Sequence, residues 1–185
     1  MALRIKSHWW NEGATRSLPE IASALAAIAW RIALDKAINL HCERFLYRDD
    51  AQRLAVIAEY LFFLIQIGDR LAHARLDDAE RRELISAFAA KVIGHVQDNS
   101  QDLLGPGDYG RPFIAGLNER SGEYAAFQLE DDGPSYAFLR HLGHEIQSLM
   151  GRDEENRWII DQVMDKDGYE AYKRFARAFQ DLLGS

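Results

Sequence analysis

Three helix-start signals divide the first half of the chain and constrain its fold more than any other feature. Each pairs an acceptor for backbone N–H groups with a Glu or Gln three positions later: Ser17 with Glu20, Asp49 with Gln52, and Asp77 with Glu80. Such pairs satisfy the free N–H groups of a helix start. Pro19 also falls in a first turn, where its missing N–H costs little. The pattern predicts three consecutive helices.

The three helices are expected to be long and closely connected. The first should run to about Arg48, the second from Asp49 to about Leu76, and the third from Asp77 to about Asn99. Connections of only two or three residues would join them. Neighbouring helices should therefore lie antiparallel.

A stretch rich in glycine and proline, GPGDYGRP at 105–112, interrupts the helical pattern. It lacks the Gly-Lys-Ser/Thr ending of a phosphate loop, so we interpret it as a connection. Shorter helices are expected beyond it, at about 112–128, 134–150, 154–165 and 168–183, the last one capped by Asp167 with Glu170. Convincing strand alternation is absent from the sequence. It therefore predicts one all-α domain over residues 1–185, with a long antiparallel three-helix core, about four shorter C-terminal helices packed against it, and a tail at 1–16.

The charge and composition argue against several classes of protein. A net charge of −7 is a poor match to nucleic-acid phosphates, so no nucleic-acid partner is expected. No membrane association is expected either, because the longest apolar run is interrupted by Gln66 and ends at Asp69. A signal peptide is not expected either. Cys42, the single cysteine, favours a reducing, cytoplasmic setting. The Trp9–Trp10 pair of the tail is expected to pack on its own domain or on a partner subunit.

Two stretches resemble metal-binding motifs, but neither has the residues that its motif requires at each position. An EF-hand loop aligned on Gly168 of DKDG would place Val163 and Arg174 at positions that need oxygen ligands. HLGHE, at 141–145, has neither residue order of the zinc proteases. We expect His141 and His144 on a solvated helix face. The chain also lacks Glu-x-x-His, which the usual di-iron bundle requires.

The second helix carries one narrow polar stripe in an otherwise apolar circumference. Glu59, Gln66, Arg70 and His73 fall on this stripe, with Asp69 at its border. This helix should therefore be central. Asp69 and His73 lie one turn apart near its end, and a local ion pair is the simpler interpretation of them.

Antiparallel folding of the three long helices brings four polar residues to one level of the core: Asp35, Asn39, Glu59 and His95. Buried polar groups must find partners. The layer is either a self-satisfied network that fixes helix register or a binding site. In the second case, all four are candidate ligand contacts, and Asp35, Glu59 and His95 are candidate metal ligands. A shifted register would leave them solvated.

Two hypotheses for function follow from these features. The first is a soluble, cytoplasmic helical interaction or regulatory protein without catalytic activity, acting as a homo-oligomer or with a protein partner. The second is a helical-bundle protein that binds a metal ion or small ligand at the polar layer. The sequence identifies no catalytic residue and no cofactor.

Overall fold

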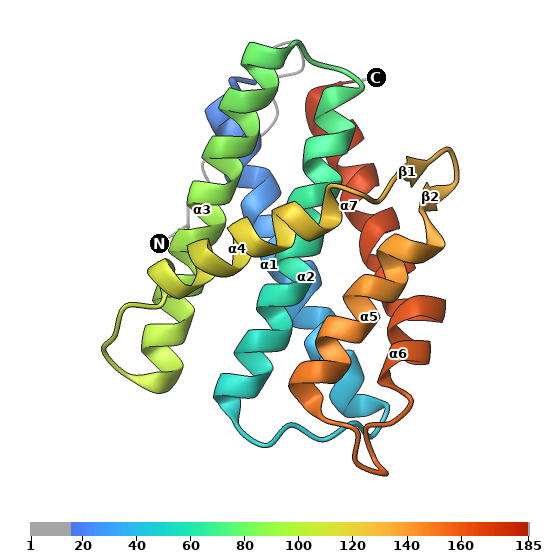
Figure 1. The fold of residues 1–185 in the computed structure, drawn as a ribbon. Coiled ribbons are helices and arrows are strands. Elements are labelled where there is room, and N and C mark those ends of the chain that lie inside the picture. The colour runs from blue at the N-terminus through green and yellow to red at the C-terminus, as the bar shows by residue number, and fades with distance from the viewer. Residues whose placement is uncertain (1–15, 185) are drawn as a thin grey trace, which may run out of the picture.

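The computed structural model describes residues 16–184 and confirms the all-α fold (Figure 1). The three-helix core consists of α1 (Leu18–Cys42), α2 (Asp50–His73) and α3 (Asp78–Leu104). In Figure 1, α1 and α3 run in one direction and α2 in the other. The Trp9–Trp10 pair lies outside the described residues.

The second half of the chain packs against this core. Its elements are α4 (Gly110–Tyr124), β1 (Leu129–Glu130), β2 (Gly133–Pro134), α5 (Tyr136–Met150), α6 (Ile159–Gln162), a π-helical segment η1 (Val163–Asp167) and α7 (Gly168–Leu183). Figure 1 shows α4 crossing obliquely over the core, with α5 and α7 on the side away from α3. The two strands form a small antiparallel hairpin, which the sequence analysis does not predict.

The apolar circumference of α2 explains why this helix is central. Residues 60–68 of α2 are all buried. Phe62 packs against Phe113 of α4, and Phe63 packs edge-on against Phe138 of α5. A Cβ at Gly68 would lie 3.2 Å from the ring of Phe88, so the missing side chain permits close approach of α3. No helix among the described residues is long and apolar enough to cross a membrane.

The ends of two core helices differ from the expected positions. α1 ends at Cys42 rather than near Arg48, because Arg44 adopts a φ of +74° and the chain turns to bury Phe45. The connection to α2 is therefore longer than expected. α3 continues past Asn99 to Leu104, and Gly105, with a φ of +91°, ends it.

The last two expected helices are one continuous helix. α6, η1 and α7 follow one another without a break, and the π-helical turns accommodate the join. The interpretation of Asp167 as a helix cap is wrong. The residue lies within this continuous helix. Its side chain makes no capping hydrogen bond and is fully buried.

Candidate functional site

The four residues of the expected polar layer lie in separate surroundings in the structure. Asp35 forms an ion pair with Arg174 of α7. The ring of His95 stacks against Trp30 at 6.2 Å. Asn39 is partly exposed on α1, whereas Glu59 is buried and faces α4 and α5.

The structure thus does not join these four residues into one network. Among residues 16–184, no group of three or more His, Cys, Asp or Glu side chains could hold a metal ion, which includes Asp35, Glu59 and His95. The prediction that these four residues share one level was based on the packing of the three long helices alone. Glu59 instead finds its partners on helices that come later in the chain.

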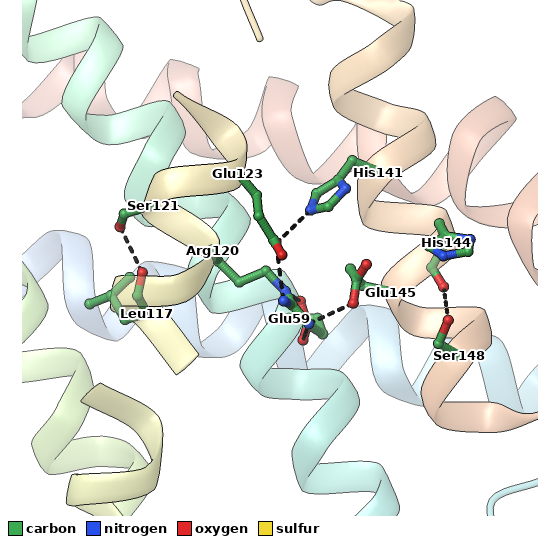
Figure 2. Close-up of polar contacts among 9 residues, drawn as sticks. All are labelled: Glu59, Leu117, Arg120, Ser121, Glu123, His141, His144, Glu145 and Ser148. Carbon is green, nitrogen blue, oxygen red and sulfur yellow. Dashed lines mark hydrogen bonds and ion pairs between the residues drawn. The ribbon is translucent and has the colours of Figure 1, made fainter. Parts of the chain in front are cut away.

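Arg120 of α4 is the centre of the charged network around Glu59 (Figure 2). Its Nε and one Nη donate to the two carboxylate oxygens of Glu59, both at 2.9 Å. The guanidinium also donates to Glu145 of α5 at 2.6 Å and to Glu123 of α4 at 3.0 Å. One cation therefore joins α2, α4 and α5.

His141 forms the outer edge of this network. Its Nε2 lies 3.0 Å from the Glu123 carboxylate. The side chain is only 18% exposed, so the expected solvated position of His141 is wrong. His144 is exposed as expected, and Figure 2 shows its ring directed away from Arg120.

Burial and charge oppose each other at the centre of the network. Burial raises the pKa of Glu59, and the hydrogen bonds and charge of Arg120 counter this effect only in part. Burial alone would lower the pKa of Arg120, but Glu59 and the other carboxylates raise it. The network is closed, because each guanidinium nitrogen of Arg120 already donates to a carboxylate. It therefore fixes the packing of helices.

Two other polar residues of the α2 stripe, Gln66 and Arg70, also contact the α4 region. Gln66 donates to the Ser121 hydroxyl at 2.8 Å. Arg70 donates to the backbone carbonyls of Tyr124, the last residue of α4, and of Phe127 beyond it. The polar stripe seen in the sequence is thus the surface on which α4 lies.

A second buried ion pair links the first helix to the last. Nζ of Lys36 lies 3.3 Å from Asp167 and 2.5 Å from Glu170. Lys36 and Asp167 are both essentially inaccessible to solvent. Burial raises the pKa of Asp167, and the charge of Lys36 opposes this. Gln162 donates to the second oxygen of Asp167, so this cluster too is satisfied internally.

Asp69 and His73 do not form the expected local pair. Arg81 of α3 makes two hydrogen bonds to the Asp69 carboxylate, at 2.8 and 2.6 Å. A third Arg81 nitrogen lies 3.3 Å from Nδ1 of His73. These residues line a groove of about 1010 Å³ between α2, α3, α4 and the segment 125–130. In Figure 1, α3 and α4 diverge from the start of α4, and α2 passes behind α4.

No protein-family model, curated protein or solved structure matches this chain.

Proposed function

We propose that this chain is a non-catalytic helical interaction protein of the cytoplasm that pairs with a second copy of itself. The observation that carries the proposal is an exposed apolar face on α1 and α3. Leu34 and Ile38 of α1 are 36% and 49% exposed, and Leu103 of α3 is 48% exposed. Large apolar side chains gathered on one face mark interaction surfaces, whereas singly scattered ones do not.

These side chains share a face because of the way α1 and α3 are paired. The stacked rings of Trp30 and His95 fix which residues lie at the same level. Leu34 and Ile38 lie one and two turns beyond Trp30, and Leu103 lies two turns beyond His95. Because the two helices run parallel, Ile38 and Leu103 come to the same level.

This α1–α3 face is complementary to itself when a second copy lies antiparallel on it. A two-fold axis at the level of Leu34 brings this residue against Leu34 of the second copy. The same axis brings Trp30 to the level of Ile38 of the second copy. It also brings Arg31 to the level of Asp102 of the second copy. Arg31 and Asp102 are exposed, and neither has an ion-pair partner among residues 16–184. Apolar and charged groups thus match in one arrangement.

The buried polar groups support a structural rather than a catalytic role. The donors of Arg120 and Lys36 are directed at carboxylates of the same chain. Neither cluster offers a free base or nucleophile to a substrate. The single cysteine supports the cytoplasmic part of the proposal, since disulfides are rare there.

Size-exclusion chromatography with light scattering tests the pairing. The wild type is expected at twice the 21.1 kDa chain mass. Leu34→Asp places two like charges at the axis, so we expect it to shift the protein to the monomer. Leu46→Asp is the matched control, because Leu46 is 53% exposed in the connection after α1 and lies off the face. A wild type that stays monomeric at about 100 µM, where even a micromolar dimer is populated, contradicts the proposal.

Exchange of charges tests the orientation of the two copies. Arg31→Asp should weaken the dimer by about fivefold or more, because it brings like charges together. Adding Asp102→Arg should restore the affinity by reversing both signs. If the double variant is weaker than Arg31→Asp alone, the antiparallel arrangement is wrong.

Binding of a metal ion or small ligand at Asp35, Asn39, Glu59 and His95 remains a prediction. The separate positions of these residues give it no geometric support. The observation that favours ligand binding is the groove beside Asp69 and Arg81, which lies away from the predicted polar layer.

A further inference from the structure

We propose that the groove between α2, α3, α4 and residues 125–130 binds an uncharged, partly apolar small molecule. This inference goes beyond the proposed self-association, because no residue that lines the groove belongs to the α1–α3 face. The occupant follows from the walls of the groove and from the way its charges are paired.

The walls of the groove suit an apolar body. Its volume of about 1010 Å³ is at the upper end of the range of small-molecule sites. Large apolar side chains line all four sides of the groove: Ile65, Leu71, Ile85, Leu117, Phe127 and Leu129. Polar groups among them, such as Asn118 and Ser86, can orient a ligand by hydrogen bonds.

Arg81, which lines the groove, is neutralised within the chain. Two of its nitrogens donate to Asp69, and its pKa is raised chiefly by this hydrogen bond. The third nitrogen faces Nδ1 of His73 at 3.3 Å. A guanidinium can only donate, so in a hydrogen bond between these two groups Nδ1 is the acceptor.

Arg70, the other arginine of the groove, is equally occupied. Its three nitrogens donate to the carbonyls of Gln66, Tyr124 and Phe127. The Tyr124 and Phe127 carbonyls lie at the end of α4, where the helix dipole is negative, and the Gln66 carbonyl lies one turn before Arg70 in α2. No donor of Arg70 is left for an anionic ligand.

The four charged residues that line the groove cancel: Asp69, Glu130, Arg70 and Arg81. An anion would find both arginines already paired and would face Asp69. A cation would find the Asp69 carboxylate already held by Arg81. A charged ligand thus loses hydration without gaining a partner, and an uncharged one does not.

Two naphthalene probes that differ by one sulfonate test this inference. N-phenyl-1-naphthylamine is uncharged, and 1-anilinonaphthalene-8-sulfonate carries one negative charge on the same framework. Fluorescence titration should show the uncharged probe binding to one site per chain. The sulfonate should bind at least about tenfold more weakly, a difference of about 1.4 kcal/mol.

Two exposed residues of α3, one turn apart, locate the probe. Ser86→Trp fills the groove and should weaken binding of the uncharged probe by about tenfold or more. Ala90→Trp is the matched control, because Ala90 is exposed and does not line the groove, and it should leave binding within about twofold. Far-UV circular dichroism shows whether both variants keep their helices.

Asp69→Asn tests the role of charge pairing without filling the groove. It removes the counter-charge of Arg81, so the affinity for the sulfonate probe should rise about fivefold while that for the uncharged probe changes little. Equal affinities of the two probes for the wild type overturn the inference. So does loss of the uncharged probe in Leu34→Asp but not in Ser86→Trp, which would place the probe on the α1–α3 face. A monomeric wild type that binds the uncharged probe in the groove overturns only the self-association.

Discussion

Removal of Arg120 should destabilise the fold more than removal of any exposed arginine. Arg120→Met leaves the Glu59 carboxylate buried, with its side chain 6% exposed and no cation in contact. Glu145 and Glu123 are 18% and 37% exposed and can turn to water, so most of the cost falls on Glu59. Breaking a buried ion pair costs about 3–5 kcal/mol. We expect a loss of that size in the free energy of unfolding at about pH 7.

The assay is urea unfolding followed by far-UV circular dichroism, with Arg48→Met as the control. Arg48 pairs with Asp49, but its side chain is 76% exposed, so its removal should cost at most about 0.5 kcal/mol. The double variant Arg120→Met with Glu59→Gln should regain about 2 kcal/mol, because the unpaired buried charge is gone. A cost below about 1 kcal/mol for Arg120→Met, or further loss in the double variant, would refute the reasoning.

The cost of Arg120→Met should also depend on pH in a defined direction. The pKa of Glu59 is already raised by burial, and loss of Arg120 raises it further. A carboxyl group with a raised pKa in the folded state favours folding below its unfolded pKa and disfavours it above its folded pKa. The destabilisation should therefore shrink as the pH falls from about 7 to about 5, in unfolding curves recorded at both values.

Three further predictions concern the buried lysine, the glycines of α4 and the tyrosines. Lys36→Met leaves Asp167 buried without its cation, so the free energy of unfolding should fall by about 3–5 kcal/mol; a loss below about 1 kcal/mol contradicts the pairing. Gly122→Ala should stabilise α4 by about 0.5–1 kcal/mol, whereas Gly116→Ala should give no gain, because its Cβ would lie 2.9 Å from Phe62. Equal gains in thermal unfolding would show that Phe62 moves aside freely. Burial raises the pKa of Tyr47, Tyr60 and Tyr124 most strongly, and that of Tyr172 as well. The free energy of unfolding should therefore fall above about pH 10, where the unfolded chain ionises its tyrosines, and a flat alkaline profile would contradict this.

The helix starts could be predicted because their signals are local. The capping boxes of Ser17 and Asp77 are both formed, and the Asp49 side chain accepts from the backbone N–H of Gln52. Each signal needs only residues within one turn. The end of α1 could not be predicted in this way, since burial of Phe45 against distant residues decides it.

The partners of the buried charges could not be predicted from local spacing. Arg120 lies 61 positions from Glu59, and Asp167 lies 131 positions from Lys36. In both cases one helix had to be placed on another before the pair could be recognised. The polar stripe of α2 could have indicated these partners. A polar stripe on a central helix indicates that another polar surface covers it.

Cross-linking at the proposed two-fold axis is the most direct test of self-association through the α1–α3 face. Cys42, which is exposed, is first replaced by serine so that only an introduced thiol can react. In the proposed arrangement, Leu34→Cys brings two thiols face to face across the axis, where a disulfide can join them. Mild oxidation should yield a covalent dimer of two 21.1 kDa chains, and Leu46→Cys should yield little. Equal or smaller yield from Leu34→Cys than from Leu46→Cys would contradict the account.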